Sequence, residues 1–516
     1  MLSAAATTSF HLPSVSYHAL APILIILGAA MLGVLAEAAL PREARYVAQM
    51  GITLAALVAA AVTVVALHGT NETTVSGALA IDGAGLFLQG TILILAVLSV
   101  LLIGERSVDV GSPIVASAAV VVGSRADREL QTTERIQTEI FPLLLFAVSG
   151  MLVFTVSNNL LLMFVALEVM SLPLYLMAGL ARRRRLLSQE AALKYFLLGA
   201  FASAFFLYGL ALLYGYAKSV DLTAILSATK GQSTQSDVLL YAGLALLLVG
   251  LLFKAGIAPF HSWTPDVYQG SPTPVTAFMA SCTKVAAFGA ILRVLYVGFN
   301  ATAWDWRPII WAVAIASMAV GAIFGLTQTD IKRILAYSSI AHAGFIMTAM
   351  VALTKDGISS VLFYLLTYGF STMAAFGLLM LVRDADGEAT HLSQWSGLAR
   401  KSPVVAGVMT ILLMSMAGIP LTAGFVGKFY VFRAAYHVAA PLVVMSLIFS
   451  AVAAFFYLRI VVLMFFAEPP ENGPTIAIPG WSTTVALTFG VVVTVVLGIV
   501  PQPVLDLAAK AAKLKA

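Results

Sequence analysis

Long apolar runs recur along the whole chain and restrict what it can fold into. A helix needs roughly 20 mostly apolar residues to cross about 30 Å of hydrocarbon, and about fourteen such runs are present. They cover approximately 19–40, 47–68, 84–104, 140–157, 160–180, 190–216, 238–271, 274–298, 308–327, 334–352, 357–382, 403–436, 440–466 and 482–501. With 60% hydrophobic and 10% charged residues, too little polar surface remains for a water-soluble fold. The sequence predicts an all-α polytopic membrane protein.

The distribution of basic residues predicts how these spans are oriented. No Lys or Arg precedes Arg42, so we expect the first span to be retained and not removed as a secretory signal. If both termini lie on the outer side, fifteen basic residues fall in inner loops and seven in outer segments, as the positive-inside rule requires. The Ala-rich composition favours a bacterial plasma membrane. No interleaved basic and aromatic pattern indicates a nucleic-acid partner.

Two spans, 238–271 and 403–436, are longer than a crossing needs, and each contains a proline beside small residues, Pro259 and Pro420. Proline removes a backbone donor and clashes with the preceding turn, so both segments are predicted to be broken helices. In hydrocarbon a break is tolerated only where the backbone is buried in protein or faces a hydrated cavity, which is typical of a transport path. A simple packing kink is the alternative.

The breaks lie five spans apart, and a repeat with an odd number of spans re-enters the membrane from the opposite side. This spacing predicts two inverted five-helix repeats, each with one broken helix. The expected organisation is a three-span region at 1–104, a cytoplasmic insertion at 105–137, a first repeat at 138–300, a second repeat at 301–468, and a final span with its tail at 469–516. The insertion has an apolar centre too short to span, so we interpret it as ordered or interfacial.

Ionisable residues inside the spans are the candidates for function. Glu168 lies near the centre of an apolar run, where a carboxylate costs at least about 2.5 kcal/mol. The predicted spans also contain the lysines Lys194, Lys254, Lys284 and Lys428. Burial disfavours an ammonium and a nearby carboxylate favours it, so such groups can hold and release protons. Snorkelling to headgroups is the alternative, and it applies most to Lys194, which is nearest a helix end.

Histidines and arginines in the spans have less specific roles. His261 in the first broken segment and His342 in the tenth span titrate close to neutrality and could relay protons, but each could equally be a structural hydrogen-bonding residue. Arg293 lies toward a helix end, as do Arg433 and Arg459, and we expect these side chains to reach headgroups or a neighbouring subunit. The run Arg182 to Arg185 is expected to anchor the topology against anionic lipid.

The sequence contains no pattern for a cofactor or a metal. Cys282 is the only cysteine, which excludes an intrachain disulfide, an iron–sulfur site and a Cys-rich zinc site. No Walker loop, dinucleotide fingerprint, haem-ligand pair or metal-ligand cluster is found. We therefore expect this chain to bind no redox cofactor.

One long segment resembles a known family. The sequence LLFKAGIAPFHSWTPDVYQGSPTPVTAFMASCTKVAAFGAILRVL at 251–295 is similar to the most specific motif of the antiporter-like subunits of respiratory complex I. The resemblance continues through the Glu168 run, EAALKYFLLGAFASAFFLYGLALLYG, TDIKRILAYSSIAHAGFIM and AGIPLTAGFVGKFYVF, and covers spans four to thirteen. The PDVYQG form at 265–270 and the lysine at Lys428 resemble the subunit N type more than subunits L and M. The insertion at 105–137 departs from the pattern.

The resemblance implies a role for each buried charge. Glu168 and Lys254 would form the charged pair of the first half-channel, Lys284 would connect the halves, Lys428 would serve the outward half, and Lys194 would be an auxiliary carrier. It also implies that FMN, iron–sulfur clusters and quinone are bound by other subunits. The expected partners are a neighbouring antiporter-like subunit, small membrane subunits and lipids.

Two other functions stay open at this point. A subunit of a multisubunit sodium/proton antiporter would share the broken helices and buried lysines, although the PDVYQG motif argues against it. A structural spacer between membrane subunits would need no buried charge, and the cost of placing charge at membrane depth argues against that reading.

Overall fold

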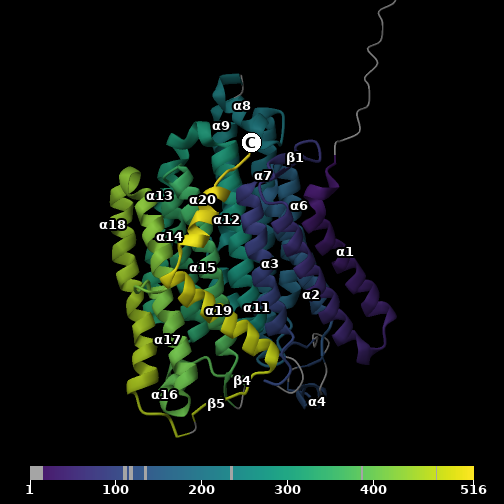
Figure 1. Cartoon of the computed structure of the whole chain (residues 1–516), viewed down its shortest axis with the longest axis vertical. Coiled ribbons are helices and arrows are strands. Elements are labelled where there is room, and N and C mark those ends of the chain that lie inside the picture. The colour runs from purple at the N-terminus through teal and green to yellow at the C-terminus, as the bar shows by residue number, and fades with distance from the viewer. Residues whose placement is uncertain are drawn as a thin grey trace, which may run out of the picture.

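A computed structural model describes residues 15–108, 113–115, 120–121, 123–132, 136–232, 236–384, 387–471 and 473–515. Most of the chain is helical, and the longest helices run between the two ends of one bundle (Figure 1). Parts of the predicted insertion at 105–137 lie outside the described residues. The expected fold class, a mainly helical protein with many apolar helices, is confirmed.

In the described part of the chain, eleven helical segments are long and apolar enough to cross a membrane. They are α1 (Tyr17–Ala39), α2 (Arg42–Ala66), α3 (Gly83–Ile103), α6 (Leu160–Ala178), α7 (Arg185–Ala217), α9 (Asp237–Ala255), the continuous segment Thr273–Gly298, the segment Asn300–Thr327 with α13 (Ala303–Thr327), α15 (Lys355–Leu379), α18 (Ala423–Phe466) and α19 (Trp481–Ile499). Two shorter apolar helices are α5 (Ile140–Val156) and α17 (Pro403–Ala417). The helix α14 (Ile331–Met350) is 20 residues long.

The segment Thr273–Gly298 is not one regular α-helix. It begins as α11 (Thr273–Phe278), widens into the π-helix η2 (Met279–Thr283), continues as α12 (Lys284–Arg293) and ends in a second π-helix, η3 (Val294–Gly298). π-Helical turns are uncommon and occur often at functional sites. The sequence analysis predicted one span at 274–298, close to these bounds, but not its π-helical turns.

Short elements complete the fold, with α4 (Arg125–Thr132), α16 (Leu398–Lys401), β4 (Gly387–Glu388) and β5 (Thr475–Ile476) at one end of the bundle and α8 (Leu222–Ser227) at the other (Figure 1). Two further short helices are α10 (Trp263–Gly270) and α20 (Gln502–Ala511). Strand β1 (Glu72–Thr74) pairs antiparallel with β2 (Leu79–Ile81), and β3 (Val382–Asp384) lies between β4 and β5, antiparallel to both. We name the end that carries α4, α16, β4 and β5 the basic end, because Arg125, Arg400 and Lys401 lie on α4 and α16. The C-terminus lies toward the opposite end.

Burial separates the central helices from the outer ones. The segment Thr273–Gly298 is buried throughout, and α3 and α15 are buried nearly throughout. The outer helices α7 and α18 expose large apolar side chains such as Phe201 and Phe455. Such a surface is suited to lipid.

The helix is interrupted at the position of the first predicted break. Helix α9 ends at Ala255, and Gly256 follows in the left-handed conformation, with φ of +67°. The chain then turns through Pro259 before α10 begins at Trp263. A left-handed residue ends a helix most readily when it is glycine, because glycine has no Cβ to clash.

The second break also lies where it was predicted, and the helices around it follow the expected spans 403–436 and 440–466. Helix α17 ends at Ala417, Gly418 has φ of +86°, and α18 begins at Ala423. The expected boundary near 436–440 is present, because Ala439 is non-helical and separates two helices within α18. The hydrogen bond between Lys428 and Ser450 joins these two helices, whereas 22 residues along one straight helix would span about 33 Å. Pro441 lies in the first turn after this break, where its missing backbone N–H costs no helical hydrogen bond.

Candidate functional site

Lys254 lies in the last turn of α9, directly before the first break. Its side chain is buried, with only 3% of the residue exposed. The ammonium donates to Ser171 Oγ at 2.8 Å and to Tyr195 OH at 3.2 Å. Both partners are hydroxyls, which can donate as well as accept. Lys254 therefore has hydrogen-bonded neighbours able to pass a proton.

Glu168 lies one turn before Ser171 on the same face of α6. Its carboxylate accepts a hydrogen bond from Ser203 of α7, and its charge acts on the Lys254 ammonium. The residue is half-buried, on a side of α6 where Val165 and Leu172 are exposed. Glu168 thus lies between the Lys254 cluster and the outer surface of this chain.

Aromatic rings fix the position of the Lys254 partner Tyr195. Its ring stacks on Trp263 with centroids 4.5 Å apart and packs edge-on against Tyr175 at 4.7 Å. Trp263 in turn donates from Nε1 to the carbonyl of Phe253 at 2.9 Å. Because Phe253 is the residue before Lys254, the short helix α10 is tied to the end of α9.

Lys284 is the first residue of α12, immediately after the π-helix η2. Only 3% of the residue is exposed, and its ammonium donates to the carbonyl and the hydroxyl of Ser339, at 2.5 and 2.6 Å. The ammonium also lies 5.5 Å from the centre of the Tyr368 ring, within the range of a cation–π contact. Ser339 of α14 lies in the second predicted repeat and Lys284 lies in the first, so this contact joins the two predicted repeats.

Tyr268 connects the surroundings of Lys254 to those of Lys284. Its ring packs edge-on against Trp263 at 6.2 Å, and its hydroxyl lies close enough to Ser339 to interact with it. An aromatic and hydroxyl path thus runs from Tyr195 through Trp263 and Tyr268 to Ser339.

His342 lies one turn after Ser338 on α14 and is buried. Its Nδ1 bonds to Tyr364 OH at 2.7 Å and its Nε2 to Tyr457 OH at 3.2 Å. Tyr457 also bonds to Ser338. His342 lies close enough to Lys284 and to Lys428 to be affected by both charges. It is therefore placed between the two lysines.

Lys428 lies in α18, after the second break, and 5% of the residue is exposed. Its ammonium donates to the carbonyls of Met416 and Ala417, at 3.0 and 2.9 Å, and to Ser450 Oγ at 2.8 Å. These two carbonyls end α17, where the last turn of a helix has no partners of its own. The break thus frees acceptors, and Lys428 satisfies them.

Lys194 is placed differently from the other predicted site residues. Its side chain is 41% exposed and forms ion pairs with Glu190 at 2.6 Å and Asp266 at 2.8 Å. Asp266 also pairs with Arg333 at 2.7 Å. The structure brings Lys254, Lys284, His342 and Lys428 into the interior, whereas Lys194 belongs to an ionic cluster at the surface.

His261 lies in the turn between α9 and α10 and is half-buried. Its Nδ1 has no hydrogen-bond partner among the described residues, and neither has the hydroxyl of Thr264 in the next turn. Buried polar groups without partners carry a cost. The structure does not join His261 to the hydrogen bonds around Lys254.

One expectation about the arginines is wrong, and another applies to only part of its run. Arg293 does not reach headgroups: it is fully buried, pairs with Asp82 at 2.8 Å and donates to the carbonyl of Thr155 at 3.2 Å. Within the run at 182–185, Arg182 and Arg185 are also buried. The backbone N–H of Arg182 donates to the carbonyl of Pro113, and Arg185 donates to that of Val120, so the insertion covers this loop.

Sequence reasoning missed the hydroxyl residues that surround the buried charges. Ser171, Tyr195, Ser339, Tyr364 and Ser450 come from helices distant in the chain, and serine or tyrosine is common in apolar helices. The one local signal was Ser171, three residues after Glu168 and so on the same helix face. Within the described residues, no group of three or more His, Cys, Asp or Glu residues is arranged to hold a metal ion.

Comparisons with known proteins place this geometry in context. Residues 157–456 match the transmembrane family described as NADH:quinone oxidoreductase/Mrp antiporter. A protein of Saccharopolyspora erythraea named NADH-quinone oxidoreductase subunit N is 61% identical over 503 residues, covering 96% of this chain and 97% of that protein. The protein of the same name from Mycobacterium tuberculosis is 52% identical over 526 residues, covering 97% and 99%.

Solved structures share the architecture. A chain of respiratory complex I from Thermus thermophilus with bound aureothin superposes with a TM-score of 0.75 at 35% identity, covering 95% of this chain and 99% of that one. A chain of the Mrp complex from Dietzia sp. superposes with a TM-score of 0.80 at 21% identity, covering 96% and 97%. The second likeness shows the fold alone.

Proposed function

The chain belongs to the NADH-quinone oxidoreductase subunit N family of respiratory complex I, and we propose that it moves protons through a relay of buried charges. The relay comprises Glu168, Lys254, Lys284 and Lys428, with His342 between the last two. Quinone reduction elsewhere in the complex supplies the energy. FMN, iron–sulfur clusters and quinone are bound by other subunits, and the partners of this chain are a neighbouring antiporter-like subunit, small membrane subunits and lipids.

The proposed topology follows the sequence analysis. The chain crosses a bacterial plasma membrane fourteen times with both termini outside. The three-span region at 1–104 and the insertion at 105–137 precede a first repeat at 138–300 and an inverted second repeat at 301–468, and the last span with its tail occupies 469–516. The eleven long apolar segments, the two shorter apolar helices and α14 support this count. The two glycine-terminated breaks support the repeats.

The first step depends on Glu168 and Lys254. An ionised Glu168 favours the ammonium form of Lys254, and protonation of Glu168 or loss of its interaction favours release of a proton from the lysine. Tyr195 and Ser171 contact the ammonium, and each hydroxyl can accept that proton while donating its own. Lys194 could act as an auxiliary carrier at the surface, since it adjoins Tyr195 in the chain and α7 holds both.

The later steps use the lysines and the histidine of the interior. Lys284 would receive the proton on the way to His342, whose two ring nitrogens contact different tyrosines and can bind a proton at one side and release it at the other. Lys428 would then pass it to the outward side. His261 is a further candidate relay at the first break, where Pro259 interrupts the helix, as Pro420 does at the second.

One observation carries the proposal: Lys254 is buried and its ammonium bonds only to hydroxyls in the structure, although placing a charge at membrane depth is costly. The test replaces Glu168 by Gln and Lys254 by Ala in the assembled complex and measures proton pumping beside quinone reduction. We expect pumping to fall by about tenfold or more, because a positioned proton carrier accelerates transfer by about a hundredfold or more. The exposed Lys355, changed to Ala, is the control. Unchanged coupled activity in both variants would refute the relay.

Sodium/proton antiport is the second candidate, because the matching family model covers the Mrp antiporters. The subunits that copurify with this chain distinguish the antiporter from complex I. Subunits with flavin and iron–sulfur clusters support complex I, whereas small membrane subunits without cofactors support an antiporter. The spacer alternative predicts that neutralising Glu168 and Lys254 alters assembly and leaves coupling intact.

A further inference from the structure

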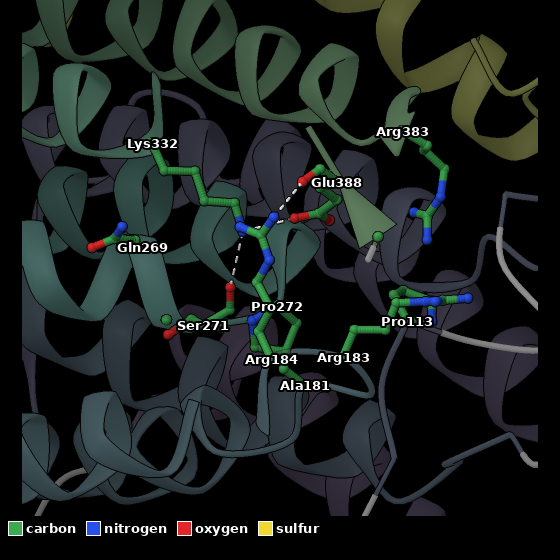
Figure 2. Close-up of a pocket in the computed structure, with 12 residues that line it drawn as sticks. Pro113, Ala181, Arg183, Arg184, Gln269, Ser271, Pro272, Lys332, Arg383 and Glu388 are labelled. Atoms are coloured by element: carbon green, nitrogen blue, oxygen red, sulfur yellow. Dashed lines mark hydrogen bonds and ion pairs between the residues drawn. The ribbon is translucent and has the colours of Figure 1, made fainter. Parts of the chain in front are cut away.

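A pocket at the basic end is formed by segments distant in the sequence (Figure 2). Its walls come from the insertion, the loop before α7, the turn between α10 and α11, the start of α14, and the β3–β4 hairpin. The lining includes Arg183, Arg184, Ser271, Lys332, Arg383 and Glu388. The cavity has a volume of about 50 Å³, whereas one water needs about 10–15 Å³. It can hold a small polyatomic group.

The side chains that line the pocket carry an excess of positive charge. Lys332 is almost fully buried and pairs with Glu388 at 2.8 Å, and Arg184 donates to the backbone carbonyl of Glu388 at 3.0 Å. Burial raises the pKa of Glu388, whereas Lys332, Thr273 and Arg383 lower it. The lowering is the larger effect, so the pKa of Glu388 lies below its usual value. The lining therefore holds one ionised carboxylate against four cations, a net charge of +3.

The hydroxyl of Ser271 gives an independent indication of a ligand. The residue is 1% exposed, yet its Oγ has no hydrogen-bond partner among the described residues. Its backbone carbonyl is used, because it accepts from Lys332 at 3.3 Å. A buried hydroxyl without a partner costs free energy. In this pocket an acceptor group on a ligand would relieve that cost.

The basic groups of the lining match the chemistry of an oxyanion. Figure 2 shows Lys332 and Arg184 directed toward Glu388, with Arg183 and Arg383 on the other side of the pocket. Guanidinium groups bind phosphate oxygens with two parallel donors, and a lysine adds a compact charge. We propose that this pocket binds a phosphate group, held by Arg183, Arg184, Arg383, Lys332 and the Ser271 hydroxyl. The phosphate of an anionic phospholipid and free inorganic phosphate offer the same chemistry.

The bound phosphate would also brace a functional helix. Ser271 is two residues before α11, which leads through η2 to Lys284, and Thr273 at the start of α11 donates to Glu388. A ligand that holds Ser271 and the Lys332–Glu388 pair together would therefore fix the end of the segment that carries Lys284. The arginine run predicted as a general anchor thus contributes two side chains to one defined site.

The test uses the assembled complex, purified and stripped of lipid, in nanodiscs of phosphatidylcholine. The variants are Arg184→Gln, Arg383→Gln and the double substitution, and Arg400→Gln, an exposed arginine on α16 outside the pocket lining, is the matched control. The first probe is photoactivatable phosphatidylglycerol added to the nanodisc, with cross-links to residues 180–185 and 383–388 quantified. The second probe is radiolabelled inorganic phosphate in nanodiscs without anionic lipid.

Each arginine removed should weaken binding by about fivefold, as expected for one basic group at a membrane surface, and Arg400→Gln should not change it. Cross-linking that depends on Arg184 and Arg383 assigns the phosphate to a lipid. Retention of inorganic phosphate with the same dependence, and no specific cross-link, assigns it to the free ion. If the wild-type complex gives neither signal, or gives signals that the variants leave unchanged, the proposal is overturned. Native gels check that each variant assembles. Where a variant does not assemble, the presence or absence of the two signals in the wild-type complex decides the outcome.

Discussion

The two broken helices end in the same way but support their lysines differently. Gly256 and Gly418 both end a helix in the left-handed conformation. Lys254 precedes its break and bonds to the hydroxyls of Ser171 and Tyr195, whereas Lys428 follows its break and bonds chiefly to backbone carbonyls. A hydroxyl can accept and donate, but a carbonyl only accepts. The first arrangement offers two hydroxyls for proton exchange, and the second offers one, that of Ser450, beside two carbonyls that stabilise the ammonium.

The largest effect should come from removing the exchanging lysine. In Lys254→Met the side chain keeps a similar volume and loses the ammonium, so we expect proton pumping by the assembled complex to fall by about tenfold or more. Stability should fall less than in Lys428→Met, because one buried hydroxyl, that of Tyr195, loses the ammonium as its partner, whereas the Ser171 hydroxyl still bonds to the carbonyl of Leu167. Pumping is measured in proteoliposomes and stability by thermal unfolding. A large loss of stability with pumping retained would show that Lys254 is structural.

Lys428→Met should give the opposite balance. The change leaves the carbonyls of Met416 and Ala417 without the ammonium that bonds to them. An unsatisfied buried polar group costs about 1–3 kcal/mol, so we expect a lower unfolding temperature than for Lys254→Met, together with reduced pumping. Lys428→Arg, which keeps the charge, should recover part of the stability. Equal stability of Lys428→Met and Lys254→Met would remove the distinction between the two breaks.

The contrast also shows what the sequence could predict. A proline beside glycine in an apolar run identifies each break, because both residues act on the local backbone. The partners of the lysines depend on packing between distant helices: Ser171 and Lys254 are 83 residues apart, and Asp82 and Arg293 are 211 apart. Arg293 was expected to reach headgroups because its position in the span is near an end, and nothing local identifies its acidic partner.

Lys332 illustrates the same limit at the basic end. From the sequence it belongs to an inner loop, but the structure places it in the first turn of α14 and buries it against Glu388. The Asp330 side chain caps this helix by accepting from the N–H of Arg333, which is a local signal for the helix start. The partner Glu388 comes from a hairpin that the sequence analysis did not predict.

A moderate effect is expected from the hydroxyls. Ser171→Ala removes one of two hydroxyl contacts to Lys254, and a hydrogen bond contributes about 1 kcal/mol, which corresponds to about fivefold in rate. Among the described residues, Ser450→Ala removes the one hydroxyl that bonds to Lys428 but leaves two carbonyls, so we expect a change in pumping below about twofold. Initial rates of pumping compare the two variants directly. If Ser450→Ala slows pumping more than Ser171→Ala does, the difference between Lys254 and Lys428 does not lie in proton exchange through hydroxyls.

The smallest effects should come from the glycines that end the helices. Gly256→Ala and Gly418→Ala each place a Cβ on a left-handed residue, which costs about 1–2 kcal/mol. At Gly418 the added Cβ would lie 2.9 Å from Cδ of Lys428, and at Gly256 it would lie 2.8 Å from the Thr264 hydroxyl. Both variants should lower the unfolding temperature of the complex slightly. Only Gly418→Ala displaces a relay lysine, so only it should also slow pumping, and a slower rate in Gly256→Ala alone would contradict the assignment of Lys428 to the path.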